Sequence, residues 1–257
     1  MEFEKVLIPT DWSDYADESV QRAIEIPGIR EVVLLHVATL REPSGNNANS
    51  HVPGHSYQTI TEHLAKDTDL LEGHGIATTV LTEPSHHTEI ARTILDVAGT
   101  IGVSLIAIGA RGTSRIREAL LGSVSHDVIR NARTHVLLMH LSGQISEQHL
   151  PDSSPKPLCA KVLCPVDLSK TSDETVRSLL RCLNRSDVIL LHVIRTAEST
   201  RHVDALRQRA TILLNEFQQE LGLQGIRAEI MIRIRDPALL TCTVAERGRV
   251  TQILLSR

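Results

Sequence analysis

The feature that most constrains the fold of this chain is an internal repeat. Residues 161–193 align without a gap on residues 5–37, and 14 of the 33 aligned positions are identical. Each copy begins with a short apolar run that ends in Pro-x-Asp, reaching Asp11 in the first copy and Asp167 in the second. Self-similarity over this length is typical of a duplicated domain rather than of one long domain.

Within each copy, apolar runs alternate with amphipathic runs. The apolar runs are short, rich in Val, Ile and Leu, and almost free of polar residues, as in buried parallel strands. Aromatic residues make up only 2% of the chain, so aliphatic side chains must build the core. In the first copy we predict strands at 5–9, 31–37, 76–81, 103–108 and 134–140, helices at 14–24, 57–72, 88–98 and from 123, a polar loop at 41–56 and a turn at Pro84. In the second copy we predict strands at 161–167, 187–193, 226–234 and 250–255, and helices at 203–221 and from 236.

This alternation predicts an α/β fold with two tandem, open, twisted parallel sheets. We place the first domain at 1–141 and the second at 158–257, with a linker at 142–157 that is polar and holds three prolines. The second domain is expected to be incomplete. It lacks counterparts of the glycine loop, the last helix and the fifth strand of the first domain.

A glycine-containing segment follows the strand expected at 103–108. It reads Gly109-Ala110-Arg111-Gly112, then nine residues, then Gly122-Ser123 and an apolar-periodic helix that includes Val124. Glycines allow main-chain N–H groups to approach a ligand, and a helix start adds further N–H groups and partial positive charge. This order predicts an anion site, although the two glycine pairs can also serve only the chain reversal. Neither the dinucleotide fingerprint nor the P-loop motif is present.

Other polar groups are expected at the same edge of the sheet, because ligands of open parallel sheets bind beyond the carboxyl ends of the strands. Asp11 follows the first strand and can accept hydrogen bonds from ribose or help to hold a divalent ion, or it can cap the next helix. Val37 can bind a ligand only through its main chain and by packing. Arg111 can neutralise phosphate charge or remain solvated. His36 and His192 recur at matching positions and are expected to be hydrogen-bonded core residues.

The strand that ends in Pro9-Thr10-Asp11 and the glycine-containing segment at 109–123, in this order, resemble motifs of the universal stress protein family, in its ATP-binding branch. The resemblance covers nearly the whole chain and implies two Rossmann-like domains similar to adenine nucleotide alpha hydrolases. It also implies roles for individual residues. Asp11 and Val37, with Pro9 and Thr10, match the ribose and adenine positions. The triphosphate segment matches Ile108, Gly109, Arg111, Gly112, Gly122, Ser123 and Val124.

The expected function is therefore ATP binding by the first domain, with AMP or ADP as alternative ligands and Mg²⁺ as a companion ion, in a stress-response or signalling module that is not a fast enzyme. A slow ATP hydrolase, a nucleotidyl- or phosphoryl-transfer enzyme and a nucleotide-free interaction scaffold remain alternatives. The resemblance also implies a homodimer formed through the edge strand at 134–141, and an unidentified signalling protein as partner.

Composition excludes several other functions. The net charge of −4 and the pI near 6.3 argue against general nucleic-acid binding. No apolar run approaches the length of a membrane span and no signal-peptide pattern opens the chain, so we expect a cytoplasmic protein without a membrane partner. No nucleophile-and-base set suggests catalysis, and no metal site is expected from the scattered histidines. The four cysteines are expected to be buried apolar residues.

Overall fold

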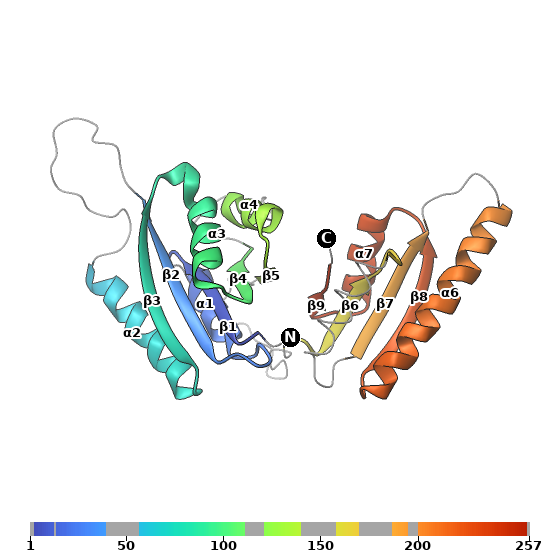
Figure 1. The fold of residues 1–257 in the computed structure, drawn as a ribbon, viewed down its shortest axis with the longest axis horizontal. Helices are drawn as coiled ribbons and strands as arrows, with labels where there is room; N and C mark the ends of the chain where they lie inside the picture. Colours follow the sequence, from blue (N-terminus) through green and yellow to red (C-terminus); the bar gives the residue numbers. More distant parts are fainter. Residues whose placement is uncertain are drawn as a thin grey trace. The chain divides into compact units, whose positions relative to one another are not determined.

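The computed structural model describes residues 3–12, 14–39, 57–110, 121–139, 158–169, 187–194 and 200–255. The chain divides into two compact units, Glu2–Gln148 and His149–Arg257. Each unit contains an open parallel sheet with helices against it, so the predicted tandem α/β fold is confirmed (Figure 1). The loop expected at 41–56 and the linker expected at 142–157 lie outside the described residues.

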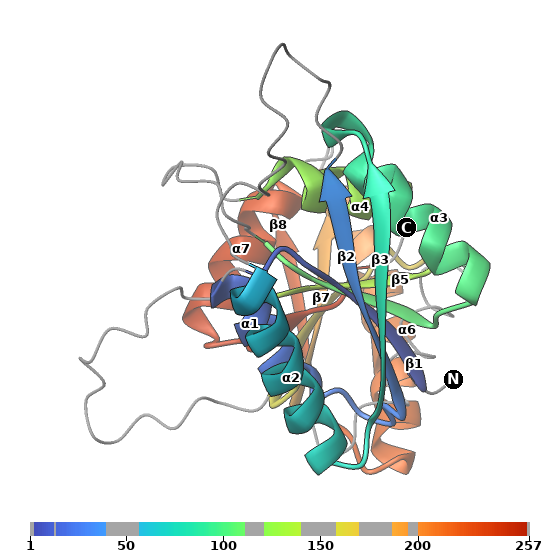
Figure 2. The same ribbon diagram turned by 90° about the vertical axis from the view of Figure 1, so that its left-hand side faces the viewer.

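The first unit is a five-stranded sheet in the order β3-β2-β1-β4-β5, and every neighbouring pair is parallel. Helices α1 and α2 contact each other on one face of the sheet, and α3 and α4 contact each other on the other face (Figure 2). The elements are β1 (Lys5–Thr10), α1 (Asp14–Ala23), β2 (Glu31–Thr39), α2 (Tyr57–Gly73), β3 (Ala77–Ser85), the 3-10 helix η1 (His87–Glu89), α3 (Ile90–Ile101), β4 (Leu105–Gly109), α4 (Ser123–Asn131) and β5 (His135–Met139).

The apolar runs form central strands because both of their faces are covered. In β1, Leu7 packs with Ile94 and Ala98 of α3, whereas its neighbours Val6 and Ile8 point to the opposite face. All three β1 side chains are 0% exposed. Continuous hydrophobicity is therefore needed in this strand, which explains why polar residues do not alternate with apolar ones.

The expectation of a turn at Pro84 is wrong. Strand β3 continues to Ser85, and Pro84 pairs in register with Ala38 of β2. Strand β3 lies at the edge of the sheet and, among the described strands, pairs with β2 alone. A proline at an edge can direct its missing N–H away from the sheet, and the strand is not interrupted.

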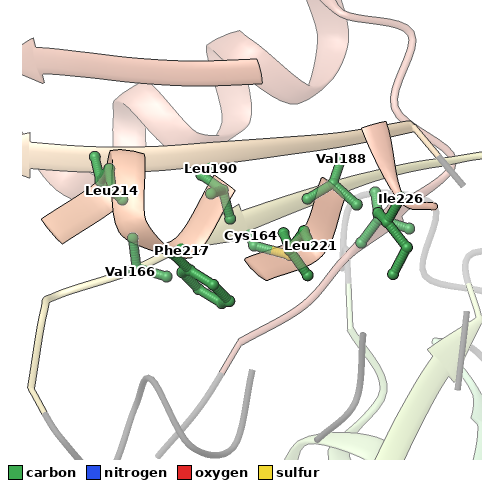
Figure 3. Close-up of a cluster of buried hydrophobic side chains, with 9 residues drawn as sticks. Cys164, Val166, Val188, Leu190, Leu214, Phe217, Leu221 and Ile226 are labelled. Atoms are coloured by element: carbon green, nitrogen blue, oxygen red, sulfur yellow. The ribbon is translucent and has the colours of Figure 1, made fainter. Parts of the chain in front are cut away.

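The second unit repeats this plan with a four-stranded parallel sheet in the order β8-β7-β6-β9. Helix α6 covers one face, where Leu214, Phe217 and Leu221 pack against strand residues that include Cys164 and Leu190 (Figure 3). Helix α7 packs on a separate cluster at the other face. The described elements are β6 (Lys161–Pro165), β7 (Asp187–Ile194), α6 (Thr200–Leu223), β8 (Arg227–Ile234), α7 (Pro237–Arg247) and β9 (Gln252–Ile253).

The two units also match in backbone detail. Gly75 and Gly225 follow α2 and α6 with φ of +74° and +78°, a conformation that favours glycine. The next N–H groups, of Ile76 and Ile226, donate at 3.0 Å to the carbonyls of Leu71 and Leu221. Because the two helices end in the same way, each residue of α2 can be aligned with one residue of α6, with Leu71 against Leu221 and Gly75 against Gly225.

The cysteines only partly follow the expectation. Cys164 is buried in the core of the second unit, and burial raises the pKa of its thiol to about 12. Cys159 is half-buried and Cys242 is exposed, so the prediction of burial is wrong for Cys242. Cys164 and Cys242 are free thiols, and Cys182 lies outside the described residues. Across the described ranges, the helices are too short or too polar to cross a membrane.

We predict that Phe217→Ala destabilises the second unit. Phe217 is 2% exposed and fills the core beneath α6, so its truncation should lower the free energy of unfolding by about 3–4 kcal/mol. Urea unfolding followed by circular dichroism measures the loss. Leu223→Ala on the same helix is the control, because Leu223 is 91% exposed and its truncation should have little effect. Equal losses in the two variants would contradict the assigned core.

Candidate functional site

The first group of predicted residues lies where β1 ends. Pro9 and Thr10 are the last two residues of β1 and pair with Leu35 and His36 of β2. Asp11 follows directly, so it leaves the sheet at the level of Val37 on the neighbouring strand. Thr10 is buried, whereas Asp11 and Val37 are half-buried. The structure therefore brings the residues expected at the ribose and adenine positions to one edge.

A strained turn fixes the direction in which the chain leaves β1. Trp12 has a φ of +58°, a left-handed conformation that is uncommon for a residue with a side chain. Its N–H donates to the Thr10 hydroxyl at 3.1 Å, and its indole lies against the His36 ring with centroids 5.3 Å apart. Trp12 is 3% exposed, so this turn is packed as well as bonded. Asp11 is held between two anchored residues.

His36 confirms the expectation of a hydrogen-bonded core histidine. Its Nδ1–H donates to the Thr10 carbonyl at 3.1 Å, which ties the end of β1 to β2. Sequence analysis assigned no role to Trp12, its partner in ring contact. The signal that could have identified Trp12 is its position: the single tryptophan of the chain directly follows Pro-Thr-Asp.

The second unit builds the same turn with different side chains. Leu168 occupies the position of Trp12 and has a φ of +63°. His192 Nδ1–H donates to the Val166 carbonyl at 2.9 Å, as His36 does to Thr10. The Asp167 carboxylate accepts a hydrogen bond from the Ser169 N–H at 2.9 Å. Duplication has thus preserved a strained turn, and its acidic residue, at both β-strand ends.

The second group of predicted residues lies where β4 ends and α4 begins. Gly109 is the last residue of β4, and Gly122, Ser123 and Val124 form the N-cap and first two positions of α4. The Ser125 hydroxyl donates to the Gly109 carbonyl at 2.7 Å, and the Gly122 N–H donates to the Ala110 carbonyl, also at 2.7 Å. These bonds hold the start of α4 against the end of β4.

Within the part of the chain that the structure describes, the start of α4 offers main-chain donors to an anion. Gly122 supplies no side-chain cap, and the first main-chain bond of the helix runs from His126 N–H to the Gly122 carbonyl. The N–H groups of Ser123, Val124 and Ser125 therefore have no acceptor within the helix. Together with the partial positive charge of the helix end, they can bind a carboxylate or a phosphate.

Gly122 is not required by the protein's own geometry. Its φ of −69° and ψ of 153° are open to any residue. A Cβ added there would lie 3.5 Å from the Ala110 carbonyl oxygen and 3.8 Å from the Ser125 Oγ, which are ordinary contacts. Main-chain conformation and packing against the described residues thus do not require a glycine here, whereas close approach of a ligand to the N–H groups would explain it.

Sheet order places the two groups together. Strand β1 lies between β2 and β4, so the chain ends that carry Val37, Asp11 and Gly109 are neighbours at one edge. The connections run from β1 to β2 and β3 on one side, and the chain then crosses to β4 on the other. The reversal between β1 and β4 is the topological switch point at which open α/β sheets bind ligands.

Two predicted residues contribute less than their positions suggest, and two cannot be placed. Ile108 is 6% exposed and packs in the core with α3 and α4, so only its main chain is available at the edge. Val37 also packs against this core. Arg111 and Gly112 lie outside the described residues. Ser125, which sequence analysis missed, has the clearest structural role in the second group.

We predict that Ser125→Ala destabilises the first unit. The substitution leaves the Gly109 carbonyl without its buried donor, so the free energy of unfolding should fall by about 1–2 kcal/mol. Urea unfolding followed by Trp12 fluorescence reports the first unit selectively. Ser123→Ala is the matched control, because Ser123 is exposed two residues earlier on the same helix. A loss of unfolding free energy no greater than that of Ser123→Ala would contradict the role of Ser125 in holding α4 against β4.

Comparison with known proteins agrees with the fold and the repeat. The sequence profile of the universal stress protein family matches residues 2–140 and again residues 160–257. Universal stress protein YxiE of Bacillus subtilis is 31% identical over 152 residues, which cover 53% of this chain and 99% of YxiE. Universal stress protein MJ0577 of Methanocaldococcus jannaschii is 26% identical over 160 residues, which cover 53% of this chain and 94% of that protein.

Solved structures extend the likeness across both units. A universal stress protein from Archaeoglobus fulgidus has a TM-score of 0.66 at 20% identity, with 98% of this chain and 84% of that chain covered. A structure described as a putative universal stress protein from Pseudomonas aeruginosa has a TM-score of 0.64 at 13% identity, with 96% and 80% covered. These low identities show the fold alone. Since the family profile covers most of the sequence in two successive copies, the chain belongs to the universal stress protein family.

Proposed function

We propose that the first unit binds ATP, or another adenine nucleotide, at the edge formed by the ends of β2, β1 and β4, and that binding serves stress-response signalling rather than fast catalysis. The observation that carries this proposal is the uncapped start of α4, held by the Ser125–Gly109 hydrogen bond at the switch point beside Asp11. Phosphate suits this arrangement, because its oxygens can accept hydrogen bonds from several of the N–H groups at the start of α4.

Each part of the nucleotide has a candidate partner. The Val37 main chain can hydrogen-bond the adenine edge, and the Asp11 carboxylate can accept hydrogen bonds from ribose hydroxyls. The N–H groups of Ser123 and Val124, with the Ser123 hydroxyl, can bind phosphate oxygens, and Gly122 leaves room for them. The remaining proposed phosphate contacts come from Gly109, Arg111 and Gly112. The Asp11 carboxylate would help to hold Mg²⁺, which would neutralise phosphate charge.

The described residues of the second unit offer the ribose side of such a site. They preserve the turn with Asp167 and the His192 hydrogen bond, which supports a ribose-side half-site. We propose that the triphosphate contacts lie in the first unit, where the glycine segment and the start of α4 are.

We predict that Asp11→Ala weakens ATP binding about 10-fold to 100-fold, because a carboxylate that accepts ribose hydrogen bonds is lost.

We also predict that Gly122→Val weakens ATP binding, because it places a branched side chain where phosphate approaches the α4 N–H groups. Isothermal titration calorimetry on the full chain measures both effects.

Asp167→Ala is the matched control for Asp11→Ala. It removes the acidic residue of the same turn in the second unit, and it should leave ATP affinity unchanged. Absence of ATP, ADP and AMP binding by the unsubstituted protein would contradict the proposal. Turnover of Mg·ATP near or above about 1 s⁻¹, abolished by Asp11→Ala, would favour an enzyme instead.

A homodimer is the second part of the proposal. Strand β5 forms one edge of the first sheet, and its residues from His135 to Leu138 are half-buried rather than exposed. The outer side of an edge strand carries N–H and C=O groups that a second strand can pair. We propose that two chains associate through residues 134–141, with an unidentified signalling protein as a further partner.

We predict a dimer mass for the purified chain at tens of micromolar. Multi-angle light scattering coupled to gel filtration measures it directly. Leu138→Pro should shift the chain toward monomer, because the pairing register turns the main-chain groups of Leu138 away from β4 and proline removes this outward-facing N–H. A monomer mass for the unsubstituted chain would overturn the proposed association.

A further inference from the structure

A cluster of ionisable side chains lies between α1 and α2, away from the strand ends that form the nucleotide site. Asp17 comes from α1, and His63, Lys66 and Asp67 come from α2. The Asp17 Oδ2 lies 3.0 Å from the His63 Nδ1 and 3.3 Å from the Lys66 Nζ. Asp17 is 7% exposed, so this pairing is largely shielded from water. One carboxylate of the cluster is thus matched by two nitrogen donors.

Asp67 is the other carboxylate, and it is not matched. Its side chain is buried, with 1% of the residue exposed, and its Oδ2 has no hydrogen-bond partner among the described residues. A buried carboxylate with an oxygen that accepts no hydrogen bond is unfavourable in its charged form, because water that would solvate it is excluded. Repulsion from the Asp17 carboxylate adds to this effect.

The duplicated unit shows that the fold does not need an acid at this position. The matching ends of α2 and α6 align Asp67 with Phe217, and His63 with Leu213. Phe217 is 2% exposed and lies in the core of the second unit (Figure 3). The same helix position is therefore filled by an aromatic ring in one copy and by a carboxyl group in the other. Packing alone accounts for the ring and does not account for the acid.

We propose that Asp67, with Asp17, His63 and Lys66 around it, forms a proton-binding site between α1 and α2 that stabilises the first unit as the medium becomes mildly acidic. This proposal does not depend on nucleotide binding. The ligand is a proton rather than a metal ion, because in the part of the chain that the structure describes no three His, Cys, Asp or Glu side chains are grouped to hold a metal.

The proton binds to the Asp67 carboxylate and forms a neutral carboxyl group. Neutralisation removes the cost of burying this charge and the repulsion between Asp67 and Asp17. Asp17 then keeps His63 and Lys66 as its partners. The charged groups that act on Asp67 are Asp17 from α1, and Lys66 and His63 from its own helix. Strand β3, which also contacts α2, carries one titratable residue, Glu83, and it is not among them.

The direction of the pH effect follows from the two states of the chain. Burial, and then repulsion from Asp17, raise the pKa of Asp67 from an ordinary 3.8 to about 6 in the folded protein. The folded state thus holds this proton about 100-fold more tightly than the unfolded state does. This contribution to stability is fully present below about pH 4 and is lost as the pH rises through about 6.

The test compares thermal unfolding of the full chain with that of Asp67→Asn, which resembles the protonated acid but cannot titrate. Trp12 fluorescence follows the first unit alone, since it is the only tryptophan and is buried there. Between about pH 5 and pH 8, the melting temperature of the unsubstituted chain should fall by about 5 °C or more relative to that of Asp67→Asn. Titrating groups that do not interact with Asp67, including His135, are common to both proteins and cancel in the comparison.

Asp69→Asn is the matched control, because it removes an exposed carboxylate from the same helix. It should retain the pH dependence of the unsubstituted chain. Parallel pH profiles for Asp67→Asn and the unsubstituted chain would overturn the proposal and leave Asp67 a structural residue. A carbon-13 titration of the Asp67 carboxyl gives an independent readout in the unsubstituted protein. A midpoint near 6 supports the site, and a midpoint at or below about 4 overturns it.

Discussion

The parallel pairing of β1 with β2 on one side and with β4 on the other is the constraint on which the first unit depends. Parallel strands all leave a sheet at the same edge, so Asp11, Val37 and Gly109 become neighbours although they are far apart in the sequence. The Ser125 hydroxyl then holds the start of α4 beside this edge, and Trp12 fixes the direction in which the chain leaves β1. The apolar runs on both faces of β1 supply the burial that stabilises the arrangement.

Comparison of the two copies distinguishes the residues that the fold requires from those that are particular to the first unit. Both units preserve the left-handed residue after Pro-x-Asp, the histidine that bonds the preceding strand, and the glycine that follows α2 in one unit and α6 in the other. They differ at buried positions where the fold accepts more than one kind of side chain. Phe217 fills the core of the second unit by packing, whereas Asp67 introduces a costly carboxyl group at the equivalent place in the first. A difference of this kind indicates a property of one unit rather than a demand of the architecture.

Local patterns predicted most elements because each depends mainly on nearby residues. Aliphatic runs predicted the strands, Asp236 and Pro237 predicted the start of α7, and the repeat predicted a second sheet. The failures have physical causes. Pro84 was expected to turn the chain, but an edge strand accepts a missing N–H that a central strand would not. Cys242 is exposed because it lies on the solvent-facing side of α7.

The sequence by itself determined the duplication, the aliphatic parallel strands, the position of Asp11 after β1 and the order of the glycine segment, since these are properties of residues close together in the chain. Only the tertiary structure decided the strand order, in which β1 lies between β2 and β4. It also decided that the Ser125 hydroxyl bonds the start of α4 to Gly109, and that Asp67 is buried near Asp17. Strand order, shared hydrogen bonds and burial arise from contacts between distant segments, and no local pattern of residues encodes their distances.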